Sequence, residues 1–287
     1  MSGPAAKFGL RSERVAVDGR IGPATVVIDG AQIAAVLGPG EPPAPDVPVT
    51  DVGGDLVVPG LIDAHTHLFL DGLTGSFGYE RALLASAPVR TLRAAASARR
   101  MLDFGFTTVR DVCTEGAGYA DVALAQAIRD GQHEGPRIVP SGPGIGITGG
   151  YMPNQSPGGC LPNGCAVCDG VEAARREVRA QVASGVAWIK VFADWPCRPA
   201  PGHRPEVCPT FTRDELAAIC DEAGRRGGRR VAAHVTSDAG ARQAIDCGAA
   251  SLEHLAPMSR ETFDRAAARG VFVVPTLSIV HHGPDDT

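Results

Sequence analysis

From residue 59 onward the sequence alternates between short β-type runs and amphipathic helical segments. We predict strands at 59–68, 106–111, 137–141, 186–192, 230–235, 251–255 and 271–277. We predict helices between them at 88–104, 119–130, 169–185, 212–226, 237–247 and 259–269. Seven strands in strict alternation with six helices indicate a parallel α/β sheet with right-handed crossovers. Both a doubly wound sheet and a TIM-type (β/α) barrel satisfy this pattern.

The first part of the chain has a different pattern. Residues 1–12 read as a loose tail, and short β-type runs separated by Asp-Gly turns and a Pro-rich link follow as far as residue 58. We therefore predict two domains. Residues 1–58 form a small β domain with too few strands to close a sandwich, and residues 59–287 form the α/β domain.

Composition limits the partners of the chain. The net charge is -5 and there is no basic run, so neither nucleic acid nor an anionic membrane is expected as a partner. The first residues contain no apolar leader, and no run approaches about 18 apolar residues. We expect a cytoplasmic protein that acts on a small molecule. The oligomeric state stays open, a homo-oligomer included.

Two histidines stand two residues apart in the first predicted strand of the α/β domain. Because side chains in a strand alternate between two faces, His65 and His67 project from the same face. Two imidazoles on one face can bind one cation, and imidazole suits zinc, nickel and iron. The alternative is a pair of hydrogen-bonded core histidines.

Three further candidates sit late in predicted strands: Lys190, His234 and His254. In a barrel the carboxyl ends of all strands converge on one mouth, whereas an open sheet spreads them along an edge, so these positions favour the barrel. Lys190 lies in an apolar run, where burial favours its neutral amine. A neutral amine can capture CO2 as a carbamate whose two oxygens could bridge two metal ions.

Seven segments of the chain resemble the amidohydrolase superfamily, in family order. They include residues 59–68, 107–111, 147–150, 188–190, 233–234, 252–254 and 274–277. Within the superfamily the chain looks most like the metal-dependent dipeptidases and the imidazolonepropionase-like enzymes. The resemblance covers about residues 12 to 280 and implies an α/β barrel with a small N-terminal β domain.

The resemblance also implies a binuclear zinc site. His65 and His67 would bind one ion, His234 and His254 the other, with carboxylated Lys190 between them. A zinc-bridged hydroxide, its pKa lowered to about 7, would attack an amide carbonyl polarised by the second ion. In this interpretation Lys190 and His254 are the catalytic residues. The substrates would be dipeptides, N-acyl amino acids or cyclic amides. The alternatives are a heterocycle deaminase and a catalytically silent metal-binding protein.

The sequence departs from the family pattern in two places. The superfamily has an aspartate at the end of strand eight, whereas this sequence stops after strand seven, and Asp285 and Asp286 lack strand context. We therefore expect a truncated barrel with two exposed strand edges, inactive by itself. The branch often has histidine after the Gly-Gly of strand three. Here that residue is Tyr151, which we assign to substrate binding because a phenol can donate to a carbonyl or carboxylate.

Eight cysteines are many for a cytoplasmic protein, and five of them lie in the loops after strands three and four. These are Cys160, Cys165, Cys168, Cys197 and Cys208. They could hold a structural zinc ion, for example at Cys160, Cys165 and Cys168, form disulfides, or remain unlinked thiols.

Three aspartates lie close to the carboxyl ends of predicted strands. We expect Asp63 to support His65 from behind and Asp111 and Asp194 to line the mouth.

Overall fold

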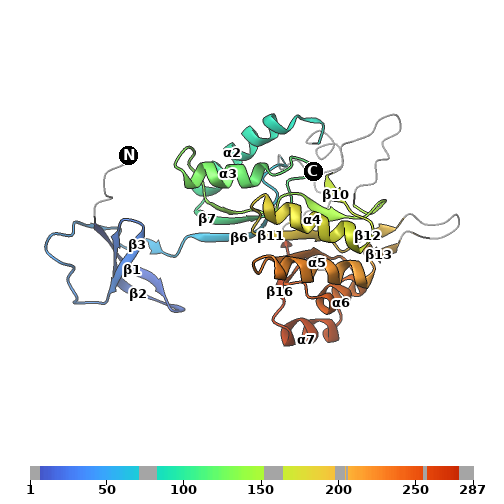
Figure 1. Cartoon of the computed structure of the whole chain (residues 1–287). Coiled ribbons are helices and arrows are strands. Elements are labelled where there is room, and N and C mark those ends of the chain that lie inside the picture. Colours follow the sequence, from blue (N-terminus) through green and yellow to red (C-terminus); the bar gives the residue numbers. More distant parts are fainter. Residues whose placement is uncertain are drawn as a thin grey trace. The chain divides into compact units, whose positions relative to one another are not determined.

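The computed structural model describes residues 7–70, 83–151, 164–197, 204, 206–254 and 257–277. It divides into two units, Met1–Gly60 and Leu61–Thr287, each with its own sheet (Figure 1). Among the described helices, none has the length and apolar character needed to span a membrane.

The first unit is a five-stranded sheet. Its strands are β1 (Phe8–Val17), β2 (Arg20–Asp29), β3 (Gln32–Leu37), β4 (Val49–Asp51) and β5 (Leu56–Val57). β1, β2 and β3 are antiparallel neighbours, and β4 and β5 both pair with β1 in parallel. Tight turns at the two Asp-Gly positions join the first three strands, as the sequence predicted, and Gly19 and Gly30 have the positive φ that such turns require.

The predicted loose tail is wrong for residues 8–12. This segment is the first half of β1 and pairs with both β2 and β4. Its buried positions are Gly9 and Ser12 rather than large apolar residues, so the alternation that would reveal a strand is hidden. A Cβ on Gly9 would lie 3.2 Å from the Thr25 side chain and 3.3 Å from that of Val49.

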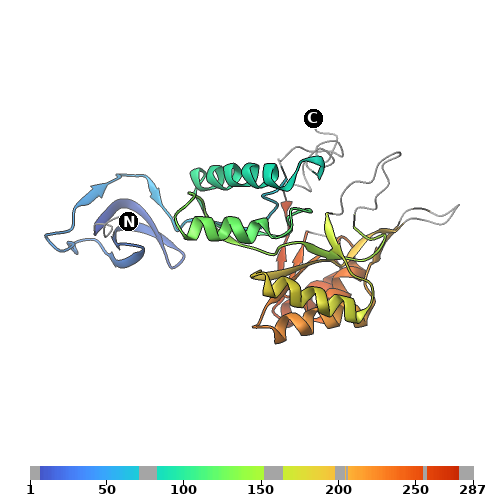
Figure 2. The same cartoon turned by 45° about the horizontal axis from the view of Figure 1, so that its top comes forward.

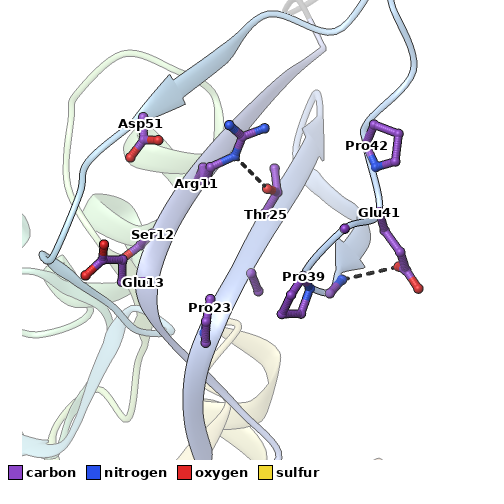
Figure 3. Close-up of a pocket in the computed structure, with 12 residues that line it drawn as sticks. Arg11, Ser12, Glu13, Pro23, Thr25, Pro39, Glu41, Pro42 and Asp51 are labelled. Atoms are coloured by element: carbon purple, nitrogen blue, oxygen red, sulfur yellow. Dashed lines mark hydrogen bonds between the residues drawn. The ribbon is translucent and has the colours of Figure 1, made fainter.

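A cavity of about 500 Å³ opens on this unit (Figure 3). Its wall includes Arg11, Glu13 and Asp51, together with Pro39 and Glu41 of the loop after β3. The polar atoms here are already paired locally: Arg11 Nε donates to the Thr25 hydroxyl at 3.5 Å, and Glu41 accepts from the Gly38 amide at 3.2 Å. None of the lining residues is a metal-ligating histidine or cysteine, so this cavity contributes nothing to the chemistry predicted above.

The second unit confirms the predicted alternation. Its parallel strands are β6 (Leu61–Thr66), β7 (Phe106–Asp111), β8 (Arg137–Val139), β9 (Gly144–Gly146), β10 (Cys165–Val167), β11 (Trp188–Phe192), β14 (Arg230–His234), β15 (Ser251–Glu253) and β16 (Phe272–Val274). Its described helices are α2 (Ala87–Asp103), α3 (Ala120–Arg129), α4 (Val171–Ala183), α5 (Arg213–Arg225), α6 (Asp238–Cys247) and α7 (Arg260–Ala268). An antiparallel hairpin of β12 (Asp194–Cys197) and β13 (Glu206–Pro209), which the sequence did not predict, follows β11.

The predicted third strand is interrupted. β8 pairs with β7, whereas β9 pairs with β11, so the parallel strands form one sheet of three and one of six. Pro140 and Pro143 lack amide hydrogens, and Gly142 has φ +68° between them. The carboxylate of Asp121 accepts from the amides of Ser141 and Gly142 at 2.9 and 2.7 Å and holds the bend.

The described strands do not close into a barrel. β6 ends the three-stranded sheet and β16 ends the six-stranded sheet, and both carry exposed apolar side chains: 70% for Ile62 and 64% for Phe272. The expected pair of exposed strand edges is therefore present at β6 and β16. Between the edges lies a cavity of about 300 Å³, whose wall draws on β6, β7, β8, β11, β14, β15 and β16.

Two apolar cores lie between the sheets and their helices. α4 to α7 pack in sequence order along the six-stranded sheet, and α2 and α3 pack together over β7 and β8 (Figure 2). α5 begins with a capping box, in which Thr212 and Glu215 satisfy each other's backbone amides. The helices thus occupy the outer face and leave the carboxyl ends of the strands open to the loops.

The start of α6 is packed directly against Asp194, which is fully buried. A Cβ on Gly240 would lie 2.8 Å from Asp194 Cγ, so we expect Gly240→Ala to destabilise the unit by about 1–3 kcal/mol or more. Gly224→Ala in α5 is the control, because its Cβ meets nothing within 4 Å. We expect it to stabilise the unit by about 0.5–1 kcal/mol. Urea unfolding measures both, and equal midpoints would contradict the close contact.

Glu222 of α5 accepts from Arg175 and Arg179 of α4 and from Arg226, and these guanidinium groups, Arg179 first, hold the pKa of Glu222 well below its usual range. A carboxyl with a lowered folded-state pKa adds stability above its unfolded value of about 4.3, and this contribution fades as pH falls. We expect Glu222→Gln to lower the thermal midpoint at pH 7 and to approach the parent below about pH 4. A constant difference across this range would point to packing instead of charge.

Candidate active site

The carboxyl ends of β6, β11, β14 and β15 bring together all five residues that the sequence singled out. His65 lies in β6, Lys190 in β11 and His234 ends β14, while His67 and His254 directly follow their strands. The imidazole centroids form a chain from His67 to His65 (5.2 Å), on to His254 (4.7 Å) and then to His234 (4.6 Å). Residues far apart in sequence therefore meet at one mouth, the convergence that favoured a barrel over an open sheet.

A buried carboxylate orients the first histidine. His65 Nδ1 lies 2.7 Å from Glu253 Oε2, and because a carboxylate accepts hydrogen bonds, the proton belongs on Nδ1. Arg110 donates to the other oxygen of Glu253 at 2.7 Å and to the Ala64 carbonyl at 2.7 Å. His65 thus presents the lone pair of Nε2 toward the mouth, the arrangement common in metal-ligating histidines.

Backbone strain accompanies the histidine after β15. His254 has φ +74° and Thr276 has φ +46°, a conformation that is rare for a β-branched residue. His254 Nδ1 lies 2.8 Å from the Thr276 hydroxyl, and the His254 amide donates to the Val274 carbonyl at 2.9 Å. β16 therefore fixes the direction of this ring.

The ring of His67 is held by the loop after β7. Its Nδ1 lies 3.3 Å from the Cys113 carbonyl oxygen and 3.3 Å from Glu115 Oε1. Both neighbours accept hydrogen bonds, so Nε2 of this ring too is left with its lone pair.

Burial keeps the cluster in its uncharged form. Desolvation, with the Lys190 amine as the next cause, lowers the pKa of His254 to about 3 and those of His65 and His234 well below the usual range. Burial likewise lowers the pKa of His67 and, against the opposing charge of Glu253, the pKa of Lys190. An uncharged imidazole has the free lone pair that a metal ion needs, and the lowered pKa of Lys190 favours the neutral amine that reacts with CO2.

Three polar atoms at this mouth are buried and have no hydrogen-bond partner within the described structure. They are His65 Nε2, His234 Nε2 and Lys190 Nζ. Unpaired buried polar atoms are rare in folded proteins and usually bind a water or an ion. No three His, Cys, Asp or Glu side chains of the described residues lie close enough to hold one ion.

Tyr151, the predicted substrate contact, stands beside this cluster. Its ring stacks on Phe192 at 3.6 Å between centroids and meets the edge of Trp195 at 4.8 Å. Trp195 in turn packs 5.2 Å from the His234 ring. The phenol donates to Glu115 at 2.9 Å. An aromatic wall therefore leads up to the histidines, and a polar group lies at its far end.

The three aspartates hold the backbone. Asp63 accepts from the His65 amide at 3.0 Å, as expected for support from behind. Asp111 is fully buried and accepts from the Leu68 amide at 3.0 Å; burial, with the charge of Asp121 added, raises its pKa well above the usual range. Asp194 accepts from the amides and hydroxyls of Thr236 and Ser237. Contrary to our expectation, Asp111 and Asp194 do not line the mouth; both are buried among backbone amides.

Two of the five loop cysteines form a disulfide. Cys197 and Cys208 link β12 to β13, which removes both from any zinc site. Cys165 and Cys168 are buried free thiols, and burial raises their pKa values to about 12 and about 11. Cys160 lies outside the described residues, so a structural zinc site that includes it stays a prediction.

Sequence reasoning missed the residues that position the histidines. Glu253 entered the sequence analysis only as part of segment 252–254. Like Lys190, it is a charged residue in a β-type run, and this pattern could have marked it as a buried site residue. Glu115 and Arg90 lie in or beside loops, where nothing in the sequence marks a charged residue as buried, although both are.

The amidohydrolase family pattern matches residues 56–285. Ochratoxinase from Aspergillus niger is 31% identical over 242 residues, which is 78% of this chain and 48% of that protein. The chain spans about half the length of the curated relatives it matches.

Solved structures agree. A prolidase in complex with N-methylphosphonate-L-proline has a TM-score of 0.80 and is 29% identical. The match covers 95% of this chain and 66% of the prolidase chain. Aspergillus niger ochratoxinase has a TM-score of 0.78 and 28% identity, covering 97% and 67%. The predicted superfamily is confirmed, and with it the TIM-barrel-like fold of these relatives. The chain belongs to the amidohydrolase family.

Proposed function

We propose that this chain carries the metal-binding part of a hydrolase that cleaves amide bonds, either a non-peptide C–N bond or that of a dipeptide. The observation that carries the proposal is the group of three buried, unpartnered atoms on His65, His234 and Lys190. These three atoms lie at one mouth. The solved structures that this chain resembles include a prolidase, a Xaa-Pro dipeptidase and an ochratoxinase.

Two zinc ions fit the donors. His65 and His67 would hold one ion and His234 and His254 the other, with Lys190, carboxylated by CO2, between them. Bound zinc would polarise the substrate carbonyl and lower the pKa of a water to about 7. Nitrogen donors and a carbamate suit zinc.

Other residues of the chain would orient the histidine ligands and the substrate. Glu253 keeps the Nδ1 proton of His65, and the contact of Thr276 with His254 Nδ1 orients the second ring, so that each Nε2 would face the mouth. The rings are partly buried, which strengthens the electrostatic contacts there. The wall of Tyr151 and Trp195 would receive the substrate, for which we propose a dipeptide, an N-acyl amino acid or a cyclic amide.

Hydrolysis is tested on the 287-residue chain and on any longer protein that contains it. Each is loaded with zinc and given a Xaa-Pro dipeptide, an N-acyl amino acid and an aminated heterocycle. Because the chain spans about half the length of its relatives, we expect it to bind zinc with little turnover and the longer protein to hydrolyse an amide until a chelator is added.

Other outcomes identify the alternatives. Ammonia released from the heterocycle alone would identify a deaminase. Tight zinc binding by the longer protein without turnover of any amide would identify a silent metal-binding protein. Absence of zinc binding in both would overturn the proposal.

Replacing Lys190 should change the stability of the chain and its zinc content in opposite directions. Its Nζ is buried without a described partner, so we expect Lys190→Met to stabilise the metal-free chain by about 1–3 kcal/mol in urea unfolding. The same change should lower bound zinc, measured by elemental analysis. Lys7→Met is the control, since Lys7 is the other lysine of the chain and is exposed. A Lys190→Met chain that keeps full zinc content and, in the longer protein, full activity would exclude the bridging role.

A further inference from the structure

The loop after β7 contains a buried glutamate that the proposed chemistry does not use. Glu115 is 1% exposed and has φ +52°, a left-handed conformation that is uncommon for glutamate. A charged group that is both buried and strained is retained only when its surroundings hold it there, and such residues cluster at functional sites.

The holding group is Arg90 of α2, itself buried. Its guanidinium donates to the carbonyl of Glu115 at 2.6 Å and to that of Thr114 at 2.9 Å. It also donates to the Phe69 carbonyl at 3.3 Å, in the loop that follows His67. One side chain thus locks the loops after β6 and β7 to each other, and the backbone of Glu115 is fixed from outside the mouth.

The carboxylate of Glu115 points between two predicted site residues. Oε1 lies 3.3 Å from His67 Nδ1, and Oε2 accepts from the Tyr151 phenol at 2.9 Å. His67, Glu115 and Tyr151 therefore form a connected chain from the histidine pair of β6 to the aromatic wall.

We propose that Glu115 is a positioning residue that, beside the Cys113 carbonyl, keeps the Nδ1 proton on His67, aims Nε2 at the ion shared with His65, and anchors Tyr151. The proposal rests on the proposed function, because it requires a metal at His65 and His67. It does not require the chain to be active, since its effect is on one ion of two. Mutation of a carboxylate that hydrogen-bonds to a metal ligand typically lowers metal affinity 10–100-fold.

The test is zinc binding by the 287-residue chain, measured by competition with a chromophoric chelator and by elemental analysis. We expect the parent to bind two ions. Glu115→Gln keeps the size of the side chain but removes its charge, so we expect one of the two affinities to fall about 10–100-fold while the other stays unchanged. A general folding defect would weaken both and lower the thermal midpoint of the metal-free chain.

Two further variants complete the design. Tyr151→Phe removes the phenol and leaves the carboxylate, so both affinities should persist. Glu172→Gln, a matched change at an exposed position of α4, should alter nothing. Two unchanged affinities in Glu115→Gln would overturn the inference alone, as would equal losses at both sites. Absence of zinc binding in the parent chain and in the longer protein alike would overturn the proposed function itself.

Discussion

The paired contacts of Glu253 are the interaction on which the arrangement of the site depends. A fully buried carboxylate is strongly unfavourable without partners, and here the partners come from Arg110 of β7 and His65 of β6. Satisfying Glu253 therefore requires β15 to lie opposite β6 and β7 across the interior. That requirement curves the sheets toward each other although no strand pairing closes them, and it carries the next residue, His254, to the His65 ring.

Much of the fold could be predicted from sequence because it follows from periodicity. The helices and most of the parallel strands lie where the apolar spacing puts them, whereas β9 and β10 were not predicted. The gathering of His65, Lys190 and His254 followed from one topological rule, that parallel strands end at the same edge. The family resemblance added the ligand assignments, which local patterns leave open, and these await the zinc measurements.

The remainder depends on contacts that no local pattern encodes. The start of β1 was missed because Gly9 and Ser12 are buried where apolar residues are expected, and the break in the third strand because it rests on Asp121 from a distant helix. Ile62 is apolar yet exposed, since its burial depends on a neighbouring strand and not on its own character. Glu115 stayed hidden because its partners are the guanidinium, imidazole and phenol groups of three separate segments.

The complete burial of Lys190 also determines how the chain can be handled. Apart from the amino terminus, the molecule offers amine-reactive reagents only two side chains, and one of them is shielded inside the second unit. Coupling to an activated surface or dye would therefore proceed through Lys7 and the terminus, both in the first unit. The protein could be immobilised through its first unit, which leaves the histidine mouth of the second unit chemically untouched.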